Sequence, residues 1–369
     1  MKPGDRKLLF ILGELTHSGV EKMLEASAGL WQQAGFQPHI LAIGAQAGDY
    51  AATLQARGYA IHHIAFSRSP AFIAALLRFH RRHAFQVVHI HTEQAAFWHA
   101  LVARLAQKHV RLIRSVHAIF AFDGFLRCRR LLQRWIMRSL LQVDFTAPSQ
   151  SVADHEAAAF ANPVAVLPNW LDTRPVDSGE LRFAARRELG IAPECFVFAS
   201  VGNCAEVKNH RGLLQAVALL PLDRPWLYLH VGSSEDEAKE KALAEQLGIA
   251  TRCLFVGRRP AADMLAAADM FVMPSLHEGF GLAAAEALSM GLHCVLADVA
   301  GLRDFSNFSP AITWCDPHAA ASIAAAIFAG MQAPQRHLDI AEAVRARFSL
   351  TAGVQRFVCL YDGRPAPQR

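Results

Sequence analysis

The sequence lacks the cysteine spacing that marks zinc fingers and disulfide frameworks. Its seven cysteines form no C-x-x-C pair, which argues against a zinc site or a disulfide-stapled secreted domain. An odd number of scattered cysteines suits a reducing compartment, so we expect a cytoplasmic protein. No stretch approaches the roughly 20 apolar residues of a transmembrane helix. We interpret the short apolar run near the N-terminus as a first strand rather than a signal peptide.

Two phosphate-binding signatures are also missing. No G-x-x-x-x-G-K-[ST] motif occurs, so an ATP-type P-loop is not supported. No G-x-G-x-x-G motif follows the first strand of either half, which weakens the case for a dinucleotide-dependent dehydrogenase. The net charge of +5 is mild and no nucleic-acid recognition module appears, so we expect no nucleic-acid partner.

What the chain does have is length and apolar content. At 369 residues, 53% of them hydrophobic, it exceeds what one core usually organises, so we predict two domains. Short apolar runs alternate with helical patterns, which indicates mostly parallel sheets covered on both faces. Turn and linker residues interrupt this alternation between residues 170 and 180. The predicted strands are at 7–13, 37–44, 60–66, 85–91, 110–117, 145–149, 195–202, 225–232, 252–257, 269–275 and 293–298.

Ligands of such sheets bind beyond the carboxyl ends of the strands, so the loops after the strands matter most. In the first of these loops, Ser18 and Glu21 have the spacing of a capping box. We favour helix capping as their role. Gly19 differs, because a small residue at a helix start lets a ligand approach the backbone closely.

The loop after the strand at 195–202 carries a lysine in a favourable place. Gly202 ends the strand, and Lys208 lies just before a helix that Asn209 can cap. A helix N-terminus together with a lysine makes a phosphate site. The alternative is an ordinary surface lysine.

The stretch HEGFGLAAAEAL, residues 277–288, contains two glutamates eight positions apart. Gly279 and Gly281 predict a loop, and the helix that follows begins near Leu282 and ends at Gly291. Glu278 therefore belongs to the loop and Glu286 to the helix. Each carboxylate can accept hydrogen bonds from a pair of sugar hydroxyls. The alternative is a charge that complements the helix dipole and a solvated helix residue.

Histidines form a further group of candidates. His89 and His91 point the same way from one strand, and a hydrogen-bonded pair at the strand end is favoured over a metal site because no third ligand is evident. His117 ends the strand at 110–117, where it either contacts a substrate or is a half-buried histidine.

A basic amphipathic helix is predicted over residues 125–142. Its apolar residues include Phe125, Leu132 and Trp135, and its arginines include Arg130 and Arg134. We favour an apolar face that packs into the core with solvated arginines, and contact with an anionic membrane surface stays open.

The residues 274–305, with the E-x7-E spacing between a strand and a glycine-flanked helix start, resemble the signature of family 4 glycosyltransferases. The resemblance spans the chain in order and includes HSGVEKML, SVHAIF, LPNWLD and VGNCAEVKNHRGLLQA. It implies a GT-B fold, in which two Rossmann-like doubly wound α/β domains face a central cleft. The implied domains are an acceptor-binding domain at 1–172, a donor-binding domain at 173–350 and a C-terminal helix at 351–369 that crosses back to the first domain.

The resemblance implies a role for each matched position. His117 would contact the transferred sugar, and Glu278 would bind its hydroxyls and support the reacting centre. Lys208 would neutralise the diphosphate that leaves, and Glu286 would hold the ribose. The remaining donor-binding positions are Gly19, Gly202, Asn203, His277, Gly279, Phe280, Gly281 and Leu282.

The implied reaction is retaining transfer of a sugar from a UDP- or GDP-sugar to a glycan or lipid-linked acceptor, in polysaccharide or lipopolysaccharide synthesis. No cofactor and no metal ion are implied, because a lysine and a helix dipole stabilise the leaving group. One departure matters: relatives usually carry an arginine where this chain has Asn203, Cys204 and Ala205. A non-catalytic sugar-nucleotide-binding protein therefore stays open as an alternative. A nucleotide-sugar epimerase stays open as well, because such enzymes share the two-domain architecture.

Overall fold

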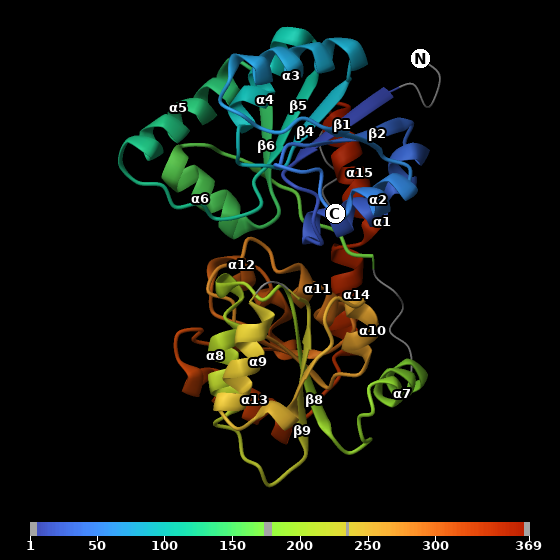
Figure 1. The fold of residues 1–369 in the computed structure, drawn as a ribbon, viewed down its shortest axis with the longest axis vertical. Helices are drawn as coiled ribbons and strands as arrows, with labels where there is room; N and C mark the ends of the chain where they lie inside the picture. Colours follow the sequence, from blue (N-terminus) through green and yellow to red (C-terminus); the bar gives the residue numbers. More distant parts are fainter. Residues whose placement is uncertain (1–5, 173–178, 234–235, 365–369) are drawn as a thin grey trace. The chain divides into compact units, whose positions relative to one another are not determined.

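The computed structural model describes residues 6–172, 179–233 and 236–364, and the chain forms two compact units. The first contains residues 1–172 and 348–369, and the second contains residues 173–347 (Figure 1). Part of the predicted junction, residues 173–178, and the last five residues of the chain lie outside the described residues. The second unit ends three residues before the expected boundary at 350.

The first unit is built on a parallel sheet of seven strands in the order β3-β2-β1-β4-β5-β6-β7. The register pairs β1 with β2 on one side and with β4 on the other, so the strand order reverses direction at β1. The strands are β1 (Arg6–Leu12), β2 (Phe36–Ala42), β3 (Ala60–His63), β4 (Val87–Ile90), β5 (Arg111–Ser115), β6 (Val143–Ala147) and β7 (Ala165–Val166).

Helices cover both faces of this sheet (Figure 1). On β1, Leu9 and Ile11 belong to the core beneath α3, α4 and α5, whereas Phe10 packs on Trp31 of α1 from the other face. This alternation follows from the two-residue period of a strand, with both faces buried. The helices are α1 (Gly19–Gln33), α2 (Ala51–Ala56), α3 (Pro70–His83), α4 (Ala96–Ala106), α5 (Gly124–Ser139), α6 (Gln150–Phe160) and α15 (Leu350–Tyr361).

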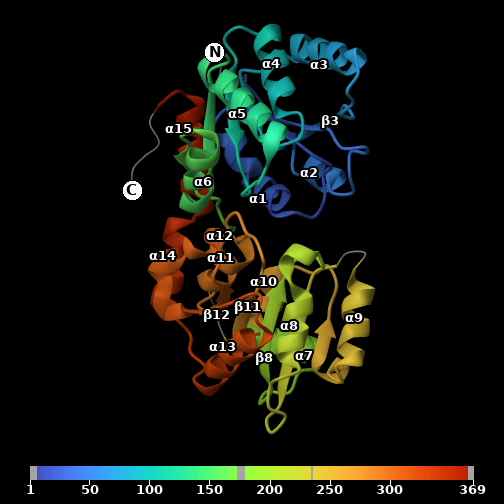
Figure 2. The same cartoon turned by 90° about the vertical axis from the view of Figure 1, so that its left-hand side faces the viewer.

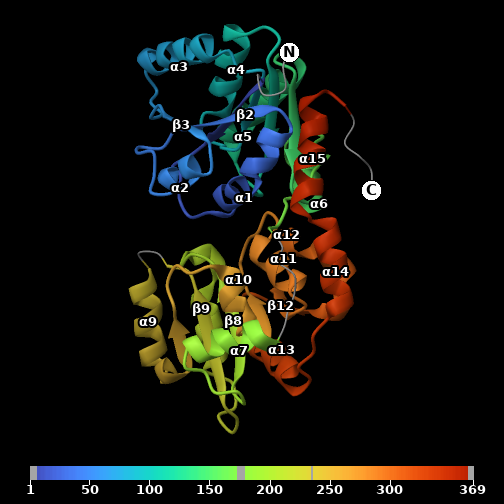
Figure 3. The ribbon, with the colours of Figure 1, turned by 90° about the vertical axis from the view of Figure 1, so that its right-hand side faces the viewer.

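The C-terminal helix α15 belongs to the first unit and packs against α1 (Figure 3). A Cβ on Gly353 would lie 2.6 Å from Cβ of Trp170, so only glycine allows this approach. At the other end of the helix, the Tyr361 hydroxyl is 2.6 Å from Nδ1 of His89. Helix α15 is thus an integral layer of the N-terminal unit, although the whole second unit, residues 173–347, separates it in sequence from the rest of that unit.

The second unit is built on a parallel sheet of six strands in the order β10-β9-β8-β11-β12-β13. The strand order again reverses direction beside the first strand of the unit, because β8 pairs with both β9 and β11. The strands are β8 (Phe196–Val201), β9 (Trp226–Val231), β10 (Cys253–Phe255), β11 (Met270–Met273), β12 (His293–Ala297) and β13 (Ile312–Cys315). The predicted pair of parallel α/β sheets is confirmed.

Two groups of helices cover the second sheet. Helix α8 packs against α9 and α13 on one face, and α11 packs against α10 and α14. The helices are α7 (Gly179–Glu188), α8 (His210–Val217), α9 (Glu237–Gln246), α10 (Ala261–Ala266), α11 (Leu282–Ser289), α12 (Ala300–Arg303), α13 (Ala320–Gln332) and α14 (Leu338–Arg347), with 3-10 turns η1 (Glu206–Lys208), η2 (Ala250–Arg252) and η3 (Ser306–Ala311).

The favoured interpretation of α5 is wrong. Its apolar side chains face solvent, since Phe125 is 84% exposed and Trp135 is 50% exposed. The side of the helix that faces the protein instead buries Met137 and Arg134, whose guanidinium makes two hydrogen bonds to Glu156 at 2.7 and 2.9 Å. Arg134 packs inward because the buried carboxylate of Glu156 lies there to pair with it. The spacing of residues within one helix does not reveal such a partner.

Among the described residues, no helix has both the length and the apolar character needed to cross a membrane.

Candidate functional site

The loop that follows β8 brings a lysine back over the end of its own strand. The backbone N–H of Gly202 donates to Val231 O at 3.0 Å, and the Lys208 side chain lies over Gly202, 3.6 Å from the place a Cβ would occupy. A Cβ on the neighbouring Gly232, with φ +144°, would lie 1.9 Å from Gly202 O. A glycine therefore follows each of β8 and β9, and no side chain at these two positions fills the space beneath the lysine.

Lys208 ends η1, and Asn209 then begins α8 in the left-handed region, with φ 57°. The side chain of Asn209 accepts a hydrogen bond from Gly212 N at 3.3 Å, which confirms the predicted cap. Its Nδ2 donates to Pro274 O at 3.0 Å and to Pro317 O at 2.7 Å. One asparagine thus fixes the start of α8 against the loops that follow β11 and β13.

Lys208 and Glu278 meet directly, although 70 residues separate them. Nζ of Lys208 lies 2.7 Å from Oε1 of Glu278, and the two side chains are 27% and 10% exposed. The backbone N–H of Leu276 also donates to Val207 O at 2.9 Å, so the two loops are hydrogen-bonded side by side. The pair places a positive and a negative group together at the carboxyl edge of the sheet, where ligands of doubly wound sheets bind.

Glycines shape the loop that carries Glu278. Gly281, with φ 83°, is the N-cap of α11, and as a glycine it has no side chain to cap the helix. Its first amides therefore stay available for an anion. A Cβ on Gly301 at the start of α12 would lie 2.2 Å from Glu278 O, so the loop rests directly on a glycine backbone. Helix α11 stops before Gly291, with φ 72°, as predicted.

The other donor-binding candidates of the second unit lie around this pair. His277 and Asn203 are exposed, whereas Gly279 and Phe280 are buried, and the Phe280 ring packs on Phe305. Leu282 is half-buried at the first position of α11. Glu286 is half-buried on the same helix, one turn further along. Loop and helix therefore place the two glutamates as the glycine positions predict.

In the first unit, the loop after β1 leads into α1. Ser18 caps the helix by accepting from Val20 N at 3.3 Å, and its hydroxyl also bonds the Glu21 carboxylate. The capping role favoured for this pair is confirmed. Gly19 is half-buried as the first residue of α1.

His117 lies beyond the end of β5 and is paired with His91. Nε2 of His117 is 2.7 Å from Nδ1 of His91, and the two rings stack with centroids 5.0 Å apart. Burial and the nearby Arg114 guanidinium lower the pKa of His117 to about 4, so the ring is neutral at pH 7. A neutral histidine at a strand end can donate or accept one hydrogen bond to a sugar hydroxyl.

His89 does not pair with His91 through a hydrogen bond, although both point from β4. Nε2 of His89 lies 2.8 Å from Oγ of Ser115, which in turn is 2.7 Å from Oγ1 of Thr146. With the Tyr361 hydroxyl on its other nitrogen, His89 belongs to a buried polar chain across β4, β5 and β6. The prediction of a hydrogen-bonded His89–His91 pair is thus wrong, because His89 bonds Ser115 and Tyr361 whereas His91 bonds His117.

Comparison with known proteins decides the family. A sequence model described as "Glycosyltransferase Family 4" matches residues 17–174, and one described as "Glycosyl transferases group 1" matches residues 182–347. The chain belongs to the family 4 glycosyltransferases.

Curated relatives agree with this assignment over part of their length. A D-inositol 3-phosphate glycosyltransferase of Streptomyces scabiei is 35% identical over 41% of this chain and 35% of its own length. The UDP-Gal:alpha-D-GlcNAc-diphosphoundecaprenol alpha-1,3-galactosyltransferase of Escherichia coli is 26% identical over 62% of each chain. The chain therefore spans between 35% and 62% of the length of these two glycosyltransferases.

Solved structures confirm the GT-B fold. A glycosyltransferase from Rickettsia africae has a TM-score of 0.81 at 16% identity, and the match covers 97% of this chain and 98% of that one. Anabaena Alr3699/HepE in complex with UDP-glucose has a TM-score of 0.80 at 18% identity, covering 97% and 99%. At these identities the likeness concerns the fold.

The position at which family 4 glycosyltransferases usually carry an arginine is filled by the short turn from Asn203 to Ala205, whose ends are joined by a hydrogen bond of 2.8 Å. Cys204, in the middle, points into the protein and is 1% exposed. Arg303, an arginine in the helix α12 of the same unit, donates from Nε to Oδ1 of Asp298 at 2.6 Å. A substitute role for Arg303 would thus require this ion pair to open.

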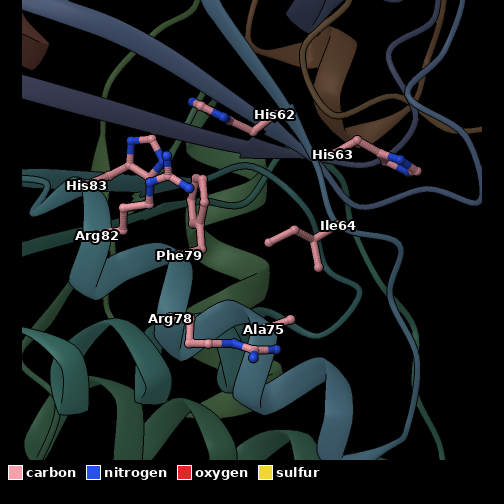
Figure 4. Close-up of a pocket in the computed structure, with 8 residues that line it drawn as sticks. All are labelled: His62, His63, Ile64, Ala75, Arg78, Phe79, Arg82 and His83. Atoms are coloured by element: carbon pink, nitrogen blue, oxygen red, sulfur yellow. The ribbon is translucent and has the colours of Figure 1, made fainter.

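This glycosyltransferase also has a hollow of about 460 Å³ in its first unit, at the edge strand β3 (Figure 4). Helix α3 contributes Arg78, Arg82 and His83, and β3 contributes His62 and His63. The hollow combines positive charge with aromatic rings, which suits an anionic ligand. Sequence spacing does not reveal this hollow, because its arginines and its facing histidines come from two different elements.

Proposed function

We propose that this glycosyltransferase transfers a sugar from a UDP- or GDP-sugar to a glycan or lipid-linked acceptor, with retention of the anomeric configuration. The observation that carries the proposal is the contact between Lys208 and Glu278 above the glycine ends of β8 and β9. In this proposal, Lys208 binds the donor diphosphate and Glu278 binds the hydroxyls of the sugar. Glu286 holds the ribose, and Gly202, Asn203, His277 and residues 279–282 line the donor.

The chemistry of the leaving group fits these residues. Cleavage of the bond between sugar and phosphate leaves negative charge on the nucleoside diphosphate. The Lys208 ammonium and the uncapped amides of α11 offer stabilisation for that charge without a metal ion. His117 and Gly19, from the first unit, are proposed to contact the transferred sugar and the diphosphate. We therefore expect transfer to proceed without added Mg²⁺ or Mn²⁺.

The acceptor is proposed to be a lipid-linked or polysaccharide intermediate of the cell surface. The E. coli relative acts, by its name, on a diphosphoundecaprenol-linked sugar. The exposed apolar side of α5 supports a membrane-bound acceptor, because Phe125, Leu132 and Trp135 are at least half exposed on one face of the helix. An amphipathic helix with outward apolar residues and flanking arginines is typical of peripheral contact with an anionic bilayer.

The first experiment is a screen of nucleotide sugars. Binding of UDP- and GDP-sugars is measured by thermal shift, since a ligand that binds the folded state raises apparent stability. Transfer is then measured with radiolabelled donor and membrane extract. Glycosidic product identifies a transferase, isomerised free donor identifies an epimerase, and tight donor binding without either product identifies a non-catalytic relative. If none of the UDP- or GDP-sugars binds, the proposed donor site is refuted.

The membrane contact has its own test. Flotation with vesicles that contain phosphatidylglycerol is compared for the wild type and for F125S/W135S. We expect the variant to float much less, whereas L338S, which removes an exposed apolar side chain in the second unit, floats like the wild type. Equal flotation of F125S/W135S and the wild type contradicts docking through α5.

A further inference from the structure

The second unit buries four side chains whose chemistry suits a soft divalent cation. They are Cys204 after β8, His210 at the start of α8, His230 on β9 and Glu240 on α9, and each is at most 9% exposed. One potential ligand atom from each lies within 4.8 Å of the other three. Helices α8 and α9 lie side by side over this edge of the sheet (Figure 2). Four elements thus converge on one buried point.

Two of the distances between potential ligand atoms are close to those of a tetrahedral site. Sγ of Cys204 is 3.4 Å from Nε2 of His230, and Nδ1 of His210 is 3.0 Å from Oε1 of Glu240. Zinc bonds of about 2.0–2.3 Å place the ligands of a tetrahedron about 3.3–3.6 Å apart. A shift of a few tenths of an ångström would therefore bring the observed pairs into range.

The charges and the surrounding hydrogen bonds also fit. A thiolate and a carboxylate balance the charge of a divalent cation, and the two imidazoles are neutral ligands. Nδ1 of His230 is held by Oγ of Ser200 at 3.1 Å, the kind of outer contact that orients a ligating histidine.

One atom of this cluster is left over. Oε2 of Glu240 is buried and makes no hydrogen bond of ordinary geometry among the described residues, and the thiol of Cys204, a weak donor, acts on this carboxylate. A buried carboxylate with so weak a donor is costly, and a cation would satisfy it.

We propose that Cys204, His210, His230 and Glu240 bind a structural zinc ion. Thiolate and imidazole ligands select zinc over magnesium or calcium, and four protein ligands leave no open position for catalysis. The ion would join both ends of the segment 204–210, which carries Lys208. It would replace the contacts of Cys204 with His230 and of His210 with Glu240 as the link between this segment and β9 and α9. On binding, the Cys204 thiol gives its proton to water.

The test begins with the full chain, purified without a metal-affinity tag or chelator. Elemental analysis is expected to find about one zinc ion per chain. Apoprotein titrated with Co²⁺ is expected to show a thiolate-to-cobalt charge-transfer band and the visible bands of tetrahedral cobalt. Cys204→Ala removes the charge-transfer band and weakens zinc binding by about 100-fold or more, because even the loss of an outer-shell contact costs 10–100-fold.

Cys294→Ala is the matched control, since Cys294 is a buried cysteine on β12, two strands away from β8. It is expected to keep both the zinc and the cobalt band. A wild type that holds no zinc and gives no thiolate band refutes the site and leaves a hydrogen-bonded cluster only. Bound metal without a thiolate band also refutes it and points to His39, His62 and His83, the other cluster of potential ligands among the described residues. Both readings use the wild type, so they hold even where Cys204→Ala fails to fold.

Discussion

Removal of the Lys208 ammonium is the sharpest test of the donor site. In the ligand-free protein Nζ lies 2.7 Å from Glu278, and the carboxylate is only 10% exposed. Lys208→Ala therefore has two effects: the diphosphate loses a charged hydrogen-bond donor, and Glu278 keeps a negative charge beside it. Hydrogen bonds to charged groups contribute about 1.5–3 kcal/mol. We expect the dissociation constant for the nucleoside diphosphate to rise about 10- to 150-fold.

A double-mutant cycle separates the two effects. Glu278→Gln in the Lys208→Ala background removes the unpaired charge, so it is expected to restore about 1 kcal/mol of binding free energy. Isothermal titration calorimetry with UDP and GDP measures each variant. Lys239→Ala is the control, because Lys239 is 82% exposed and its ion pair is with Asp236, the N-cap residue of the same helix α9. Binding of Lys208→Ala within about twofold of the wild type would refute a diphosphate site at Lys208.

Three further predictions concern stability, measured by chemical denaturation. Gly301→Ala places a Cβ 2.2 Å from Glu278 O and should cost about 1–3 kcal/mol, whereas Gly29→Ala, with nothing within 4 Å, should not destabilise α1. Arg134→Met strands the fully buried Glu156 carboxylate and should cost about 3–5 kcal/mol, most of which Glu156→Leu in the same chain recovers. Burial lowers the pKa of His99 to about 3, so the unfolded chain binds a proton that the folded chain does not, and the free energy of unfolding falls as pH drops from 6.5 towards 3. His99→Leu should flatten this fall by about 2.5 kcal/mol at pH 4.5, and an unchanged slope would contradict the neutral buried ring.

Much of the fold was predictable because local patterns determine it. The alternation of apolar runs with helical segments predicts two parallel sheets, and turn residues such as Gly281 and Gly291 mark the ends of α11. The lysine before α8 and the glutamate before α11 were also predictable, since both follow strands of one sheet and parallel strands end at the same edge. What the sequence could not show is that their charged ends lie 2.7 Å apart.

The errors share one cause, which is that a partner far away in the sequence decides what a side chain does. Residues 125–142 have a clear apolar side, but Glu93 and Glu156 draw Arg130 and Arg134 inward and leave that side exposed. His89 is a strand-end histidine by its spacing, yet Tyr361, 272 positions away, takes its Nδ1. Cys204 forms no C-x-x-C pair, so its spacing hid the four-residue cluster.

The sequence by itself determined the class of fold, the strands of both sheets except β7 and β13, and the loops that carry Lys208, Glu278 and Glu286. It did so because hydrophobic periodicity and glycine positions are local properties. Only the tertiary structure decided which charges pair, which side of α5 meets solvent and which side chains surround Cys204. Those outcomes depend on desolvation, and the burial of a charge is favourable only where folding brings its partner to the same place.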